Sequence, residues 1–306
     1  MTRIASLQSQ QSALLNLQRA QSREAQAGAQ VASGKLGDDH KAYGRGSEGI
    51  AALKSVQARV GGWRDAVDGL TGRLEMQDLM LNTVLEGAGD ARQAITEALG
   101  ADRGDDLMAA IAGAFTKVAS GLNARYDGKA LFGGARLDEA PLAADTLADL
   151  TAIPAADLFR NDGLKASVRL GEQTIVGVGE LASETGAGVM AAFRDVQAYV
   201  EANGPFGRPL APAQRDFLQG AIGAFDAAQD GIRQVVARNG AVQKRVDGIG
   251  AELETRSISL KAVIGDRTEV DPAEAISRLE QARIAVQASA QVFATLRGTS
   301  LLDLLR

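Results

Sequence analysis

The sequence contains no cysteine and a single histidine, His40. The lack of cysteine excludes disulfides, thiolate metal sites and thiol nucleophiles. A single histidine nearly excludes histidine metal clusters and serine–histidine–aspartate triads. Asp38 and Asp39 precede His40, and a solvated loop is a more ordinary interpretation of this run than a cation site. Because no convergent catalytic set is present, we expect no enzyme activity, no metal and no cofactor.

Long apolar runs are also missing, and aromatic residues are scarce. No stretch approaches the ~20 apolar residues that a membrane-spanning helix needs, so we expect no membrane segment. Residues 1–11 lack the apolar core and cleavage pattern of a secretory signal, so we expect no cleaved signal peptide. A net charge of -5 argues against binding to nucleic acid backbones.

Proline is confined to a few places. The chain has six prolines, and none lies in residues 1–140 or 213–271. Proline costs about 3 kcal/mol in a helix interior, so tracts that avoid it can run as long helices. The abundance of alanine also favours helices that approach one another closely.

The first proline-free tract carries a heptad seam, in which apolar positions alternate steps of three and four residues. The pattern predicts one helix from about Ser47 to Leu99, which would be about 80 Å long at 1.5 Å per residue and would give a rod-shaped molecule. The seam positions are Leu53, Val56, Val60, Trp63, Val67, Leu70, Leu74, Gln77, Leu81, Val84, Ala88, Ala91, Ile95 and Ala98.

A second seam of the same kind lies in the second proline-free tract, and two seams predict helix pairing. Its polar members Asn239 and Arg256, like Gln77 in the first seam, either fix the register or are tolerated near a solvated end. A shorter amphipathic helix, with apolar residues at Leu107, Ile111, Phe115, Val118 and Leu122, could supply a third member of the bundle. The second seam comprises Ile232, Val235, Asn239, Val242, Val246, Ile249, Leu253, Arg256, Leu260 and Val263.

The middle of the chain has a different pattern. Asp127-Gly128 is a turn signal, and the β-prone runs Lys165–Leu170 and Thr174–Val178 are separated by a tight turn. We therefore predict a small β-rich insertion at residues 135–185. The motif G-x-G-x-x-G at residues 44–49 has no strand before it and no βαβ pattern after it, so we expect no dinucleotide site there.

Both ends of the chain look helical but contain long uncharged stretches, Ile4 to Gln18 and Ile284 to Leu296. Asp271 is the expected N-cap of the last helix, with Pro272 at its first position. A solitary surface helix normally carries charges on its outer face. We therefore expect both ends to be enclosed by other subunits and to be poorly ordered before assembly.

These patterns predict a mainly α fold: an elongated, coiled-coil-like helical bundle formed by the N- and C-terminal halves, with a small β-rich insertion. We expect residues 1–45 and 270–306 to form an inner assembly domain of terminal helices. Residues 46–134 and 186–269 would form a long-helix rod domain, and residues 135–185 a small outer domain.

Four groups of motifs occur in an order that resembles one family. The motifs are Gln30–Lys35 followed by Asp38-Asp39, Arg125–Arg136, Val236–Ala241, and the closing helix with Asp271–Ala275, Gln287–Ser289 and Ser300–Leu305. In these motifs the chain resembles bacterial flagellin-like axial proteins, and within them the hook-filament junction branch. Flagellin, the filament subunit, is the alternative. One departure is Leu36-Gly37, which stands where the family usually has an arginine.

The resemblance implies a structural component of the bacterial flagellum, joining hook to filament and self-assembling through its terminal helices. It further implies type III export to the extracellular flagellum, and a chaperone that binds the C-terminal region. Its axial neighbours would be further copies, a hook-side adaptor protein and flagellin. A cytoplasmic coiled-coil signalling rod would lack the proline-marked insertion, so the sequence disfavours it. The expected subunit-interface residues are Ile4, Leu7, Leu14, Leu279, Val286, Phe293, Leu296, Leu301, Leu302, Leu304 and Leu305.

Overall fold

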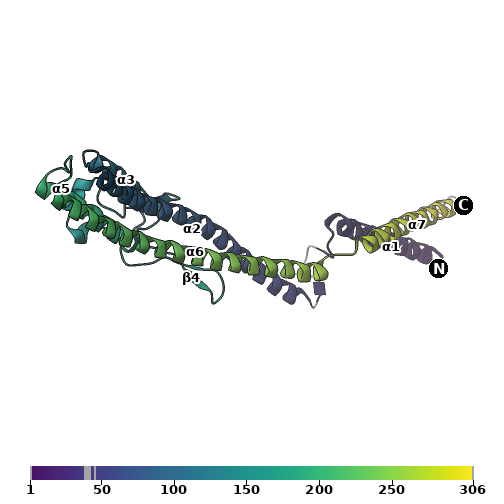
Figure 1. Cartoon of the computed structure of the whole chain (residues 1–306). Helices are drawn as coiled ribbons and strands as arrows, with labels where there is room; N and C mark the ends of the chain where they lie inside the picture. The colour runs from purple at the N-terminus through teal and green to yellow at the C-terminus, as the bar shows by residue number, and fades with distance from the viewer. Residues whose placement is uncertain (1, 38–42, 45, 305–306) are drawn as a thin grey trace. The chain divides into compact units, whose positions relative to one another are not determined.

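The computed structural model describes residues 2–37, 43–44 and 46–304, and leaves the side chains of residues 2–7 and 298–304 undescribed. The run Asp38, Asp39 and His40 lies outside the described residues. The chain divides into two compact units, one made of residues 1–59 and 256–306 and the other of residues 60–255. The helices α2 (Ser47–Ala101) and α6 (Pro212–Thr268) contribute to both units (Figure 1).

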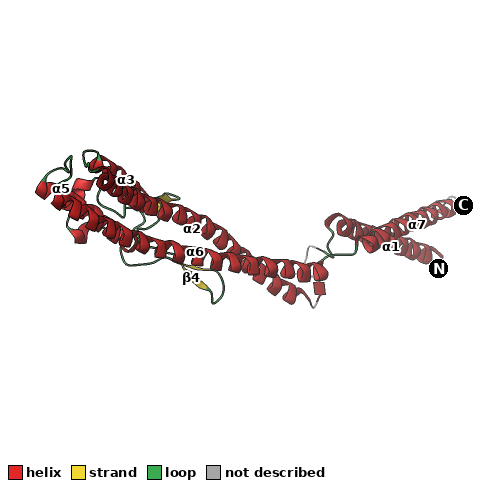
Figure 2. Ribbon diagram, in the orientation of Figure 1, coloured by secondary structure: helices red, strands yellow, loops and turns green. Residues whose placement is uncertain are grey.

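Helices dominate the described part of the chain (Figure 2). The expected mainly α fold with long packed helices is confirmed. The helix predicted from about Ser47 to Leu99 is α2, which differs from the prediction by two residues at its C-terminal end. The division into three domains stays a proposal.

The predicted seam of α2 is buried from Val60 to Ala98, apart from the half-buried Trp63. Within residues 60–255, α6 runs antiparallel to α2, because Arg64 forms an ion pair with Glu254 while Arg92 forms one with Asp226. The heptad pattern thus identified both the face of α2 that is buried and the need for a long partner helix.

The seam of α6 follows the prediction only as far as Leu253. Beyond it, Arg256 is exposed and Val263 is 39% exposed, whereas Ser257 and Ile264 are buried. The assignment of Arg256 and Val263 to the seam is therefore wrong. The step after Leu253 is four residues rather than three, which leaves the Arg256 guanidinium in water and avoids the large cost of burying its charge.

The second unit holds the main apolar core. Four helices pack there on one another: α3 (Leu107–Leu122), α5 (Ala182–Asn203) and the adjoining parts of α2 and α6. Phe193 on α5 contacts Phe115 on α3 and Phe225 on α6 edge-on, with ring centroids 5.7 and 5.0 Å away. The shorter amphipathic helix that the sequence predicted is confirmed as α3, and its five predicted apolar positions are all buried: Leu107, Ile111, Phe115, Val118 and Leu122.

Glycines bring α2 and α3 close together. A Cβ atom at Gly87 of α2 would lie 2.6 Å from Val118 Cγ2, and one at Gly121 of α3 would lie 2.7 Å from Val84 Cγ2. The contact is therefore reciprocal: a valine of each helix packs against a glycine of the other. Any side chain at either glycine would force them apart.

Two small antiparallel hairpins occupy the middle of the chain. The first pairs β1 (Arg125–Tyr126) with β2 (Lys129–Ala130) across the predicted Asp-Gly turn. The second pairs β3 (Ser167–Arg169) with β4 (Ile175–Gly177), as the two β-prone runs predicted. The same segment contains a helix, α4 (Leu147–Ala152), and a 3-10 turn, η2 (Ala155–Asp157), which the β-prone pattern did not predict.

Two aspartates organise the loops of this segment by accepting backbone hydrogen bonds. Asp162 Oδ1 accepts from the amides of Ala135 and Leu164, at 2.9 and 3.1 Å, and these bonds hold the pKa of Asp162 below its ordinary value. Asp149 Oδ2 accepts from the amide and the hydroxyl of Thr146, at 2.7 and 2.9 Å, which lowers the pKa of Asp149 in the same way.

These two aspartates should make the insertion sensitive to acid. A group whose pKa is lower in the folded state stabilises the fold above its unfolded pKa, near 4 for aspartate, and this contribution is lost as the pH falls through the folded value. We expect the protection of residues 130–165 against hydrogen exchange, relative to the intrinsic exchange rate at each pH, to fall below about pH 4. The variant D149N/D162N, which keeps oxygen acceptors but cannot titrate there, should show a flatter pH dependence; equal pH dependence in both proteins would contradict this prediction.

Candidate functional site in the terminal helices

The two ends of the chain form one helix pair. Helix α1 (Thr2–Ser33) packs against α7 (Pro272–Leu304). The pair is antiparallel, because Gln10 Nε2 donates to the Leu296 carbonyl at 3.4 Å, whereas Gly28 at the other end of α1 faces Leu279. Figure 1 shows the N- and C-terminal helices side by side.

Local signals in the sequence set where α7 begins. Asp271 Oδ1 accepts hydrogen bonds from the amides of Ala273 and Glu274, at 2.8 and 3.3 Å. This is the N-cap that the sequence predicted, with Pro272 as the first helical residue. The same turn carries an ion pair between Arg278 and Glu274, four residues apart.

Small side chains line the contact between α1 and α7. Alanine lets two helices approach closely but buries little apolar area, so this pair gains less from its own seam than a pair with leucine at these positions would. Half-buried leucine, valine and phenylalanine side chains share the stripe. The buried residues are Ala13, Ala20, Ala27 and Gln30 on α1 and Ala275 and Ala282 on α7.

The structure separates the expected interface residues into three groups. Leu279, Val286, Phe293 and Leu296 are half-buried and share the α7 stripe that includes the buried Ala275 and Ala282. Leu14 is 41% exposed on α1. Ile4, Leu7, Leu301, Leu302 and Leu304 lie in α1 or α7 with side chains outside the described set, and Leu305 lies outside the described residues.

Other large apolar side chains of the pair point to solvent and were missed as individual residues. On α1, Leu15 is 51% exposed; on α7, Ile276, Ile284 and Val292 are 49%, 65% and 56% exposed. Three of them, Leu15, Ile284 and Val292, lie inside the uncharged stretches at residues 4–18 and 284–296. The lack of charge was therefore the signal that could have identified them, since it marks a whole surface rather than one stripe. We call Leu15, Ile284 and Val292 the outer apolar residues.

Backbone hydrogen bonds join the segment that follows α1 to the segment that precedes α7. Gly34 has a positive φ of 69°, which favours glycine, and the chain turns there. The Leu36 amide donates to the Thr268 carbonyl at 2.8 Å, and the Val270 amide donates to the Gly34 carbonyl at 3.0 Å. The Gln30 side chain adds a bond to the Leu36 carbonyl at 2.9 Å. The Gly34-Lys35 motif thus holds both terminal helices at one place.

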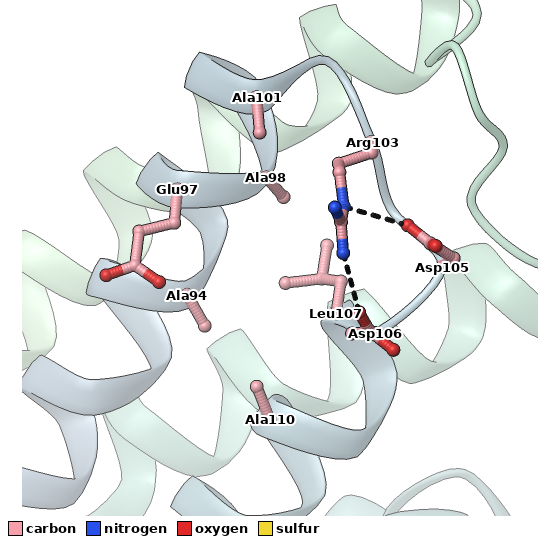
Figure 3. Close-up of a pocket in the computed structure, with 9 residues that line it drawn as sticks. All are labelled: Ala94, Glu97, Ala98, Ala101, Arg103, Asp105, Asp106, Leu107 and Ala110. Atoms are coloured by element: carbon pink, nitrogen blue, oxygen red, sulfur yellow. Dashed lines mark hydrogen bonds and ion pairs between the residues drawn. The ribbon is translucent and has the colours of Figure 1, made fainter.

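The second unit has a surface pocket of about 260 Å3 where α2 turns into α3 (Figure 3). Three of the four charged side chains that line it form ion pairs, because Arg103 contacts Asp105 at 3.3 Å and Asp106 at 2.9 Å, and the fourth, Glu97, accepts a hydrogen bond from Gln93 Nε2 at 2.8 Å. Asp105 also contacts Arg208 at 3.6 Å. Alanines form most of the remaining wall, and the ion pairs hold the turn between α2 and α3.

The described residues contain no group of three or more histidine, cysteine, aspartate or glutamate side chains that could hold a metal ion. The glycine motif at residues 44–49 leads directly into α2. The described positions at and just before its start, 43–44 and 46, are not in a strand. No helix among the described residues is both long enough and apolar enough to span a membrane.

Comparisons with known proteins agree with this arrangement. Residues 222–305 match the family of the bacterial flagellin C-terminal helical region. A search of curated proteins finds no match. Among solved structures, a Vibrio parahaemolyticus protein described as a putative flagellar hook-associated protein matches with a TM-score of 0.60 and 14% identity, covering 73% of this chain and 97% of that one.

A second solved structure, that of Bacillus cereus FlgL, matches with a TM-score of 0.56 and 13% identity, covering 70% of this chain and 99% of that one. At these identities the two matches show a shared fold. Together with the family match they confirm the resemblance that the sequence motifs indicated. Residues 222–305 therefore match the family of the bacterial flagellin C-terminal helical region, within a chain whose fold resembles those of a flagellar hook-associated protein and of FlgL.

Proposed function

We propose that this protein is a structural subunit of the bacterial flagellum that joins hook to filament and assembles through its terminal helices. The observation that carries the proposal is the α1–α7 pair, which has an alanine seam inside and the outer apolar residues outside, within uncharged stretches. A surface of this kind is suited to contact with further copies of the same pair. The role is mechanical and requires no catalytic group.

Assembly would be driven by apolar side chains that remain exposed to solvent in a single chain. Each leucine, isoleucine or valine that becomes fully buried contributes about 1.5 to 3 kcal/mol. A head-to-tail contact that repeats this burial from copy to copy generates a helical array. The absence of charge matters as much as the apolar area, because an unpaired charge in such an interface would cost several kcal/mol.

Flagellin, the filament subunit, is the second candidate, since the matched family is named for flagellin. The junction role is supported by the two structural matches, whose descriptions are a flagellar hook-associated protein and FlgL. Deleting the gene distinguishes the two roles. A junction mutant should keep its hooks and release filament protein into the medium, whereas a filament mutant has no filament protein to release.

The remaining parts of the proposal follow from the same family. The subunit would leave the cell unfolded through the type III export apparatus, with a chaperone on its C-terminal region beforehand. In the extracellular flagellum its neighbours would be further copies, a hook-side adaptor protein and flagellin. Immuno-gold electron microscopy tests the location: labelling confined to the distal edge of the hook supports the junction role, and labelling along the filament supports flagellin.

A charge placed on the outer face of α7 should block assembly without unfolding the chain. Val292 is 56% exposed, so V292E should leave the thermal unfolding of the isolated protein nearly unchanged. In a deletion strain, V292E should fail to restore filaments and swimming, because assembly would bury an unpaired carboxylate.

The matched control is L79E, since Leu79 on α2 is also 56% exposed but lies outside the terminal helices. This variant should restore swimming. Normal filaments with V292E would contradict the assignment of the terminal helices as the assembly surface. Loss of filaments with both variants would show that an added charge blocks assembly wherever it is placed, and would contradict the assignment as well.

A further inference from the structure

A polar layer interrupts the apolar seam between α2 and α6 in the second unit. It consists of Gln77 on α2 and Asn239 and Gln243 on α6. Gln77 is 0% exposed and Asn239 is 2% exposed, although most seam positions around them are aliphatic. Burying two amide side chains in such a seam costs stability, so the layer calls for a physical explanation.

The two α6 side chains of the layer converge on one carbonyl of α2. Asn239 Nδ2 donates to the Leu74 carbonyl oxygen at 3.3 Å, and Gln243 Nε2 donates to the same oxygen at 3.0 Å. Asn239 Nδ2 also lies 3.5 Å from Asp78 Oδ1. A shift of α6 by seven residues, about 10.5 Å at 1.5 Å per residue, would carry both donors away from Leu74.

Gln77 differs from the α6 members of the layer. Neither its side-chain oxygen nor its side-chain nitrogen has a hydrogen-bond partner among the described residues. Gln77 therefore adds the cost of a buried amide without a bond that ties α2 to α6. The same layer thus contains two donors that link the helices and one amide that does not.

The layer lies at the edge of the main apolar cluster. That cluster includes α2 from Leu81 onward and α6 up to Val235, and the polar layer borders it, with Gln77 four residues before Leu81 and Asn239 four residues after Val235. Beyond the layer, the buried seam consists of aliphatic side chains at heptad spacing, such as Val60 and Val67 on α2. Such a seam repeats every seven residues, so its own packing specifies the register only weakly.

We propose that Asn239 and Gln243 act as a register clamp, which holds α6 against α2 at the Leu74 carbonyl where the main core ends. In a register displaced by seven residues, both donors would lose Leu74 and the amides of the layer would lie against aliphatic positions. Two hydrogen bonds of ordinary net strength favour the clamped register by about 10- to 30-fold. The clamp does not depend on the proposed function.

Disulfide trapping can measure the register directly, because the natural chain has no cysteine. The pair V67C/G250C reports the observed register, since a Cβ at Gly250 would lie 3.2 Å from Val67 Cγ1. The pairs V60C/G250C and L74C/G250C report displacements by seven residues in either direction. In the otherwise natural sequence, V67C/G250C should form the disulfide and the other two pairs should not.

Adding N239L/Q243L should lower the ratio of the observed to the displaced disulfides by about tenfold or more. The matched control is Q77L, which removes the unpaired amide of the same layer. It should raise the melting temperature and leave the ratio unchanged. If N239L/Q243L does not fold, the single variants N239A and Q243A are measured in the same way and should each give a partial fall.

Three results would overturn the clamp. The first is an unchanged ratio in N239L/Q243L or in both alanine variants. The second is a fall of V67C/G250C without a rise of either displaced pair, which would mean that the helices separate rather than slide. The third is an equal fall in Q77L, which would assign the register to the buried amide rather than to the bonds at Leu74.

Discussion

Replacing Phe193 by alanine is expected to lower the free energy of unfolding of the second unit by about 3 to 5 kcal/mol. The Phe193 side chain is 0% exposed, and its ring meets Phe115 and Phe225 edge-on. The variant loses the apolar burial and leaves a cavity among three helices that can collapse only partly. It also loses two aromatic contacts, each contributing about 0.5 to 1.5 kcal/mol beyond burial.

Urea unfolding followed by circular dichroism measures this loss. The control is F193L, which keeps most of the volume and should cost about 1.5 kcal/mol or less. A loss below about 1 kcal/mol in F193A would show that the core refills the space and that the three rings are not a structural centre.

A single added methyl group at Gly121 is expected to destabilise the protein by about 1 to 3 kcal/mol. Its Cβ would lie 2.7 Å from Val84 Cγ2 and 3.1 Å from the Met80 carbonyl oxygen of α2. The valine can adjust only within a packed core, and the carbonyl belongs to a helix backbone. G121A should therefore push α3 away from α2 and lower the melting temperature.

Gly113 provides a control of opposite sign on the same helix. It is exposed, and nothing lies within 4 Å of the position its Cβ would take. G113A should stabilise α3 by about 0.5 to 1 kcal/mol, because alanine loses less conformational freedom than glycine in a helix. Thermal unfolding should move in opposite directions for the two variants; movement in the same direction would contradict the close packing at Gly121.

Features that depend on neighbouring residues could be predicted from the sequence. The length of α2 follows from the absence of proline and from an unbroken heptad pattern between Ser47 and Ala101. The start of α7 follows from Asp271 and Pro272, and the hairpin of β3 and β4 from two β-prone runs around a turn. In each case the signal lies within a few residues of the feature that it determines.

The two aspartates of the insertion show why other features could not be predicted. Asp162 accepts a hydrogen bond from the amide of Ala135, 27 residues earlier in the chain, and no local sequence pattern predicts that contact. The seam shift at Ser257 likewise depends on which side of α6 finds an apolar partner. Helical α4 forms where the surrounding residues suggested only strands and loops.

The candidate site in the terminal helices also has features that the sequence determines and features that only the tertiary structure decides. The sequence by itself determined that both ends of the chain are helical and uncharged, because composition and period are properties of each segment alone. Only the tertiary structure decided that Leu279 faces Gly28 while Ile284 and Val292 remain exposed. Periodicity shows that a helix has an apolar face, but the element that covers this face is set by contacts between residues far apart in the chain.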